Sequence, residues 1–256
     1  MNKKNQIEII ARLMDPIIPL YHSSLPIVLF WNPKCGCTSL IKWFFFQIGQ
    51  LEQARGYSTW IHAYREEVFE KQKHYKTIVK NELLHGKKTT YKLVRNPYKR
   101  AVSSYFAVLA VPSILEQIAP GRPEGISFKQ FLYRIRAIGV KRNKINPHIA
   151  QQYSDGEEHI IDQYLKLENF SEELRAIEKK FDLKKAPLNQ LSSSNHHNSQ
   201  RMNLKVTNSY ATRNMKPYLL KDIPSYEHFY DDETMQIVKN LYADDFKKLG
   251  YNPNIL

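Results

Sequence analysis

The sequence is poor in the residues that build disulfide frameworks and metal clusters. Its 256 residues include only two cysteines, Cys35 and Cys37, which lie one residue apart. A disulfide between residues i and i+2 would be badly strained, and no further cysteine is present to pair with either one. A structural zinc site needs about four ligands, and no nearby pair of His or Cys residues completes one. We therefore expect two free thiols in a tight loop and no bound metal.

Long apolar runs are also missing. No segment approaches the ~18 uninterrupted apolar residues that a membrane helix needs. Residues 1–24 begin with basic residues, but Glu8, Arg12, Asp15 and two prolines interrupt the apolar positions that follow. This pattern is atypical of a signal peptide. The sequence therefore predicts a cytoplasmic protein without an integral membrane segment.

Basic residues are in clear excess. The chain has 38 Lys and Arg against 25 Asp and Glu, which gives a net charge of +13 and indicates an anionic partner. Nucleic acid, an anionic membrane surface, a nucleotide and an acidic glycan all qualify, and the basic residues are too evenly spread for charge alone to choose. Peripheral association with a membrane therefore stays open, and the composition indicates no particular oligomeric state.

Segments typical of strands alternate with segments of helical spacing. The 42% hydrophobic content fits a globular protein, and the alternation predicts an α/β fold, with a central parallel sheet flanked by helices, in a single domain spanning residues 1–256. Strands are expected over 27–31, 89–94 and 163–170. Helices are expected over 38–49, 63–85, 98–110, 127–139, 171–181 (opened by Ser171) and 231–250. Residues 1–25 are expected to form an N-terminal extension and the polar segment 186–217 a long loop.

The segment FWNPKCGCTSLIKWFFF, residues 30–46, is predicted to run from a strand through a tight turn into a helix. Such a turn is an anion site, because backbone N–H groups and the helix dipole face outward there. Lys34 adds a full charge, and Thr38 or Ser39 can cap the helix through a hydroxyl. The turn differs from the ATP-binding GxxxxGK[ST] motif, because Gly36 is its only glycine and the lysine does not precede the hydroxyl residue directly. A sharp turn with an exposed lysine is the alternative.

A second strand, turn and helix follow in YKLVRNPYKRAVSSYF. Arg95 comes directly after the predicted strand, at the carboxyl end where ligands gather in open α/β sheets. Ser103 lies eight residues later, about two turns into the helix. A planar guanidinium and a hydroxyl suit a phosphate monoester. The alternative is an arginine that caps the sheet edge and a serine that packs against it.

Both segments resemble the cofactor motifs of sulfotransferases that use 3′-phosphoadenosine 5′-phosphosulfate (PAPS). NPKCGCTSL (32–40) resembles their 5′-phosphosulfate loop, and RNPYKRAVSSY (95–105) resembles their 3′-phosphate site. The carbohydrate branch, which modifies chondroitin and heparan, is the most similar. NPHIAQQY (146–153) resembles its His-Trp-x-Pro-Gln region, with Ile149 in place of Trp and Gln151 in place of Pro, and YLKLENF and LYADDFKKLGY resemble its C-terminal half. Animal members have a membrane anchor and several disulfides, so we expect this chain to be a soluble bacterial relative.

The resemblance implies a P-loop-like three-layer fold, PAPS as the donor and a carbohydrate hydroxyl as the acceptor. Lys34 would stabilise the charge that develops on the bridging oxygen as the sulfuryl group leaves, and no metal is expected. The loop 186–217 is then expected near the acceptor. The resemblance assigns the 5′-phosphosulfate to Pro33, Lys34, Cys35, Gly36, Cys37, Thr38 and Ser39, and the 3′-phosphate to Arg95 and Ser103.

The acceptor hydroxyl needs a base, and histidine suits this role at neutral pH. We predict His62, which lies between the two cofactor motifs in the sequence, as the catalytic base. Glu66 and Glu67 are the carboxylate alternatives. His148 falls on the histidine of the family's acceptor-side motif, so we predict that it binds the acceptor.

Two other classes of protein share part of this pattern. A P-loop-type nucleotide kinase has the same sheet and anion loop, but it needs a lysine beside the hydroxyl residue and a carboxylate for magnesium, and neither is apparent. A nucleic-acid-binding protein would explain the charge and the 16 tyrosines, but no known binding motif is present. We therefore expect no nucleic-acid partner.

Overall fold

The computed structural model describes residues 2–192, 202, 204, 209–216 and 223–256. The chain folds into two compact units, one of residues 1–94 with 154–195 and one of residues 95–153 with 196–256. They are called unit 1 and unit 2 below.

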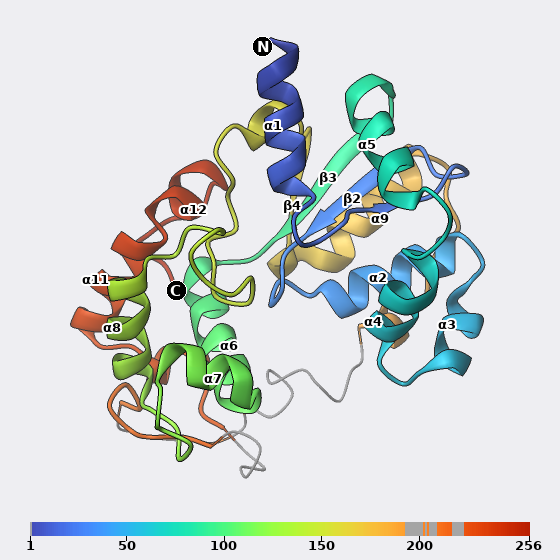
Figure 1. The fold of residues 1–256 in the computed structure, drawn as a ribbon. Helices are drawn as coiled ribbons and strands as arrows, with labels where there is room; N and C mark the ends of the chain where they lie inside the picture. Colours follow the sequence, from blue (N-terminus) through green and yellow to red (C-terminus); the bar gives the residue numbers. More distant parts are fainter. Residues whose placement is uncertain (1, 193–201, 203, 205–208, 217–222) are drawn as a thin grey trace. The chain divides into compact units, whose positions relative to one another are not determined.

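Unit 1 contains a sheet of four strands in the order β1 (Leu20–Tyr21), β2 (Ile27–Trp31), β3 (Thr89–Val94) and β4 (Gln163–Lys166) (Figure 1). The last three strands are parallel, and the two-residue β1 is antiparallel to β2. Leu93 of β3 lies opposite Trp31 of β2 and Leu165 of β4, so the three parallel strands end at the same edge. The predicted α/β class is confirmed, with a mostly parallel sheet.

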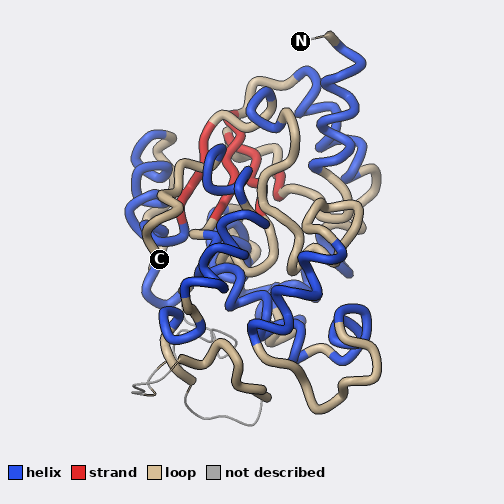
Figure 2. Tube along the Cα trace, turned by 90° about the vertical axis from the view of Figure 1, so that its left-hand side faces the viewer, coloured by secondary structure: helices blue, strands red, loops and turns tan. Residues whose placement is uncertain are grey.

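Figure 2 draws the strands of this sheet in red and the helices in blue. Side chains alternate along β3. On one face Lys180 lies 3.3 Å from the Tyr91 hydroxyl, and on the other Lys92 bonds to Glu157, so both faces are covered. The helical segments of unit 1 are α1 (Lys3–Leu13), α2 (Cys37–Gln47), α3 (Leu51–Tyr57), α4 (Ile61–Tyr64), the π-helix η1 (Arg65–Phe69), α5 (Tyr75–His85), the 3₁₀ turns η2 (Glu157–His159) and η3 (Leu167–Asn169), α9 (Phe170–Lys180) and α10 (Leu188–Leu191).

A buried ion pair lies under the sheet. Lys92 Nζ is 2.5 Å from Glu157 Oε2, and Tyr164, the neighbour of Lys92 on β4, donates to Glu157 Oε1 at 3.1 Å. Burial raises the pKa of Glu157, and Lys92 acts against this rise. Both charged groups are almost fully buried, so removal of one partner would leave an uncompensated buried charge. The ion pair connects η2 with β3.

Unit 2 is helical and has an aromatic core. Phe229 packs against Phe106 and Phe128 with ring centroids 5.3 and 6.0 Å apart. Its helical segments are α6 (Pro97–Ala110), α7 (Pro112–Ile118), α8 (Phe128–Ile138), η6 (Tyr226–Phe229), α11 (Asp232–Leu241) and α12 (Ala243–Lys248). Among the described residues no single helix is long and apolar enough to cross a membrane; α6 and α7, bent by 110°, reach that length and hydrophobicity only as a pair.

The strands predicted over 27–31 and 89–94 are confirmed to the residue. The predicted strand over 163–170 ends at Lys166, and the chain continues as a 3₁₀ turn. Consequently α9 begins at Phe170, so the expectation that Ser171 opens it was wrong.

Other helix predictions differ in detail. Residues 63–85 form α4, η1 and α5 with a break after Phe69, and 231–250 form two helices that meet at Tyr242. The sequence did not predict α1, which packs Ile9, Ile10 and Leu13 into the core of unit 1. The predicted loop 186–217 contains α10, and most of the rest lies outside the described residues.

Candidate active site

The loop between β2 and α2 has an unusual backbone. Lys34 and Gly36 have φ angles of 69° and 83°, in the left-handed region. A lysine rarely adopts this conformation, and such strain concentrates at functional sites. Gly36 avoids this strain because glycine has no Cβ. A Cβ at this position would also lie too close to the Leu167 side chain. The loop therefore holds the backbone of Lys34 in a strained conformation, two residues before the N-cap of α2.

Helix α2 begins one residue earlier than predicted. Gly36 occupies the N-cap position, and no side chain caps the helix. The expectation that Thr38 or Ser39 caps it was therefore wrong, because both residues lie inside the first turn. An N-terminus without a side-chain acceptor retains N–H groups that can bind an anion.

His62 of α4 lies beside this loop. Its Nε2 atom is 3.4 Å from Thr38 Oγ1 and 3.6 Å from Cys37 Sγ. The imidazole lies between two tryptophans, since the ring centroids of Trp31 and Trp60 are each 5.5 Å from it. His62 is 8% exposed, whereas Trp60 is 48% exposed. The structure thus brings His62 to the predicted 5′-phosphosulfate loop, with the exposed ring of Trp60 next to it.

Neither Cys35 nor Cys37 forms a disulfide in the described part of the chain. Burial raises the pKa of the Cys37 thiol, and the positive charges of Lys34 and Arg65 act against this rise. The thiol is therefore neutral at pH 7, and it forms no ion pair with the nearby imidazole.

Both carboxylate alternatives to His62 are engaged by neighbours. Glu66 forms an ion pair with Arg65, which is buried and also bonds to Glu70. Glu67 accepts a hydrogen bond from the Tyr57 hydroxyl at 2.7 Å. Each carboxylate is therefore already engaged by a neighbouring side chain.

Arg65 and Trp31 were not predicted as site residues. The Arg65 guanidinium lies 4.8 Å above the Trp31 ring, and Trp31 in turn contacts His62. Arg65 Nε and Trp31 Nε1 are buried donors without a hydrogen-bond partner among the described residues. No local sequence signal marks this stack, because it joins the end of a strand to a π-helix 34 residues later.

In unit 2 the structure brings Arg95 and Ser103 together. Arg95 Nη1 donates to Ser103 Oγ at 3.0 Å, and Nη2 donates to the Tyr226 hydroxyl at 2.6 Å. The guanidinium also lies 5.2 Å from the centre of the Tyr226 ring. The sequence singled out Arg95 and Ser103 but not their contact, and it missed Tyr226, which lies 131 residues from Arg95 in the sequence.

His148, the predicted acceptor contact, lies in the same unit. Asn146 Oδ1 accepts from its backbone N–H at 3.0 Å and lies 2.9 Å from its Nδ1 atom. The His148 carbonyl accepts from Ser104, the residue that follows Ser103 on α6. Helix α6 therefore carries one hydroxyl that contacts Arg95 and another that holds the backbone of His148.

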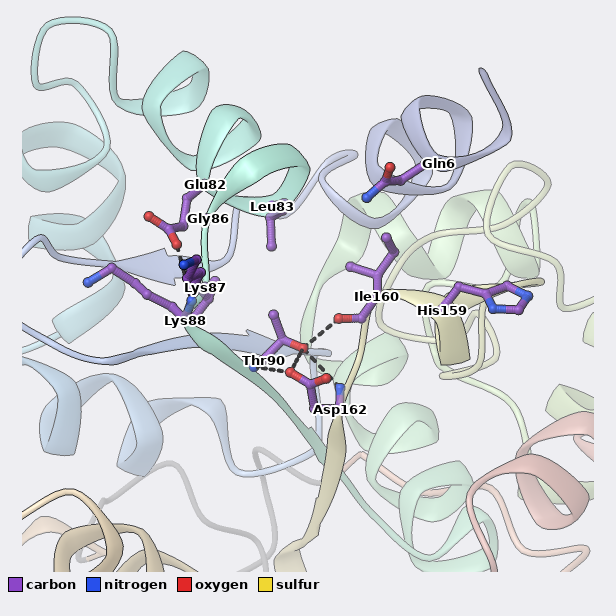
Figure 3. Close-up of a pocket in the computed structure, with 11 residues that line it drawn as sticks. Gln6, Glu82, Leu83, Gly86, Lys87, Lys88, Thr90, His159, Ile160 and Asp162 are labelled. Carbon is purple, nitrogen blue, oxygen red and sulfur yellow. Dashed lines mark hydrogen bonds between the residues drawn. The ribbon is translucent and has the colours of Figure 1, made fainter. Parts of the chain in front are cut away.

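A pocket of about 250 Å³ lies elsewhere in unit 1 (Figure 3). Val28 and Thr90, near the amino ends of β2 and β3, line it, whereas the Lys34 loop follows the carboxyl end of β2. Asp162 accepts from the backbone N–H of Thr90 at 2.8 Å. None of the predicted site residues lines this pocket. No group of three or more metal-ligating side chains occurs in the described part of the chain.

A comparison with protein families gives one match. The model described as "Sulfotransferase family" matches residues 25–252, a range that includes every predicted site residue. No curated protein and no solved structure matches the chain. The match favours sulfuryl transfer over the kinase and nucleic-acid-binding alternatives. The chain belongs to the sulfotransferase family.

Proposed function

We propose that the protein transfers the sulfuryl group of PAPS to a hydroxyl of a carbohydrate acceptor. The observation that carries this proposal is that two turns with basic residues follow adjacent parallel strands. The Lys34 loop follows β2, and Arg95 is the first residue after β3. Ligands of open α/β sheets bind at this carboxyl edge.

The residues of both turns fit the donor. Residues 32–40 contain a lysine, two hydroxyl groups and no acidic residue, which suits the 5′-phosphosulfate. Arg95, Ser103 and Tyr226 supply a guanidinium and two hydroxyls, which suit the 3′-phosphate. This second phosphate distinguishes PAPS from ATP, so the proposal predicts nucleotide selectivity.

Each catalytic residue has one task in this proposal. The acceptor oxygen attacks the sulfur, the bond from sulfur to the bridging oxygen breaks, and adenosine 3′,5′-bisphosphate leaves. Lys34 stabilises the negative charge that develops on the bridging oxygen. His62 Nε2, which lies 3.4 Å from the Thr38 hydroxyl in the first turn of α2, takes the proton of the acceptor hydroxyl.

A sugar acceptor agrees with the surroundings of His62. Trp60 presents an exposed indole against the imidazole, and the C–H face of a sugar ring can stack on such a ring. We assign His148 to the acceptor as well. Two cysteines, Cys35 and Cys37, that form no disulfide support a reducing, cytoplasmic location.

Nucleotide selectivity tests the proposal. The protein should be retained on immobilised adenosine 3′,5′-bisphosphate and eluted by that nucleotide at concentrations at which ATP and duplex DNA do not elute it. Arg95→Ala should weaken the retention. Equal elution by ATP would favour the kinase, and elution by DNA alone would favour a nucleic-acid-binding protein.

A further inference from the structure

Gln152 bonds to both backbone groups of Arg95. Its Oε1 atom accepts from the Arg95 N–H at 2.8 Å, and its Nε2 atom donates to the Arg95 carbonyl at 2.8 Å. This two-point contact resembles the pairing between neighbouring strands. It occurs one residue after the last pair of the sheet, Val94 with Lys166. The Gln152 side chain thus makes two hydrogen bonds to the Arg95 backbone of the kind that a neighbouring strand would make.

Asp245 of α12 holds Gln152 in place. Its carboxylate accepts from the Gln152 backbone N–H at 2.9 Å, from Gln152 Nε2 at 3.3 Å and from the Tyr153 N–H at 2.7 Å. Gln152 and Asp245 are both fully buried. Since the amide oxygen and both amide hydrogens of Gln152 are used, its side chain has one orientation.

The two bonds from Gln152 fix the backbone of Arg95, from which the Arg95 side chain extends. The guanidinium reaches Ser103 and Tyr226 at the same time, and such two-sided geometry tolerates errors of only about 0.5 Å. A rotation of the backbone at Arg95 would displace the far end of this long side chain by more than that.

We propose that Gln152, oriented by Asp245, is a positioning residue that sets Arg95 for the 3′-phosphate of the nucleotide. This inference rests on the proposed function. It gives a nucleotide-side role to a residue of the segment 146–153, which the sequence had connected only with the acceptor.

The same segment is anchored independently of Gln152. Arg100 donates to the carbonyls of Ala150 and Pro147 at 2.8 and 3.3 Å, and the Tyr242 hydroxyl donates to the Ile149 carbonyl at 2.8 Å. A substitution of Gln152 should therefore leave the segment folded.

Calorimetry with adenosine 3′,5′-bisphosphate and adenosine 5′-monophosphate tests the proposal. Gln152→Leu should weaken binding of the bisphosphate by about 10-fold and that of the monophosphate by less than about 2-fold. Asp245→Asn should also lower the ratio of bisphosphate affinity to monophosphate affinity, by a smaller factor than Gln152→Leu. Gln151→Leu is the matched control, because Gln151 is a buried neighbour whose amide donates to the Tyr153 carbonyl; it should leave the ratio unchanged.

Equal weakening of both ligands by Gln152→Leu would overturn the inference. If that variant does not fold, Gln152→Glu takes its place, since it keeps the shape and the acceptor atom but loses the donor to the Arg95 carbonyl. Arg95→Ala separates this failure from that of the proposed function. If Arg95→Ala lowers the ratio and the Gln152 variants do not, only the positioning role is refuted. If Arg95→Ala also leaves the ratio unchanged, the 3′-phosphate site itself is refuted.

Discussion

Replacing His62 tests the chemistry of the candidate site most sharply. A general base contributes about 10²- to 10⁴-fold to the rate, so His62→Gln should lower kcat by that factor. The glutamine amide cannot take a proton, but it can still reach toward Thr38, whose hydroxyl lies 3.4 Å from His62 Nε2. The affinity for adenosine 3′,5′-bisphosphate should therefore change little.

The structural cost of this change can be bounded from the contacts of the ring. The imidazole makes aromatic contacts with Trp31 and Trp60, each worth about 0.5–1.5 kcal/mol. Their loss amounts to roughly 1–3 kcal/mol, against a typical stability of about 5–15 kcal/mol. The variant should stay folded, so a loss of turnover would report chemistry.

The assay is single-turnover sulfuryl transfer measured across pH, together with calorimetry. The wild-type rate should fall at acidic pH, because a protonated imidazole cannot accept the proton of the acceptor, and His62→Gln should lose this acidic limb. Glu67→Gln is the control for the carboxylate alternative and should leave kcat within about 3-fold of wild type. Near-normal turnover in His62→Gln, with the acidic limb intact, would refute the assignment of the base.

Substitutions at three further positions separate the remaining roles. Lys34→Ala should lower kcat by about 10²–10³ while nucleotide affinity falls much less. Lys34→Gly, whose glycine adopts the φ of 69° without strain, should be equally slow. A normal kcat with a raised KM for PAPS would show that Lys34 only binds the donor. Arg95→Ala should cost about 1.5–3 kcal/mol, or roughly 10- to 100-fold, in affinity for adenosine 3′,5′-bisphosphate, and an equal loss for the 5′-monophosphate would contradict the site. Trp60→Ala should raise KM for a glycan acceptor by about 5- to 10-fold. The control Tyr133→Ala removes a 38% exposed ring on α8 and should leave this KM unchanged. Equal effects of the two variants would show that Trp60 is not part of the acceptor site.

The sequence predicted the parts of the fold that depend on local pattern. The continuous apolar run 27–31 is a strand buried along its whole length, as expected for a strand covered on both faces. The sequence also singled out Arg95 and Ser103, which contact each other in the structure.

Contacts between distant residues could not be predicted in this way. Tyr226 reaches Arg95, Asp245 orients Gln152, and Glu157 neutralises Lys92. Each pair is separated by 65 or more residues, and no periodicity in the sequence relates such positions. Tertiary packing alone brings them together.

The error at the start of α2 has a physical reason. Serine and threonine are common N-caps, but Gly36 adopts a left-handed conformation and takes the cap position itself. Thr38 then lies in the first turn, and its hydroxyl faces His62. The hydroxyl that was expected to cap the helix is thereby available to the site.

Transfer of radiolabelled sulfate from PAPS to a panel of glycans and lipopolysaccharide fragments tests the central claim most directly. The account predicts that at least one saccharide acquires label only when PAPS and the wild-type protein are both present, and that Lys34→Ala slows this transfer by about 10²-fold or more. Transfer of labelled phosphate from ATP to an acceptor, with no transfer of sulfate from PAPS to any saccharide, would contradict it.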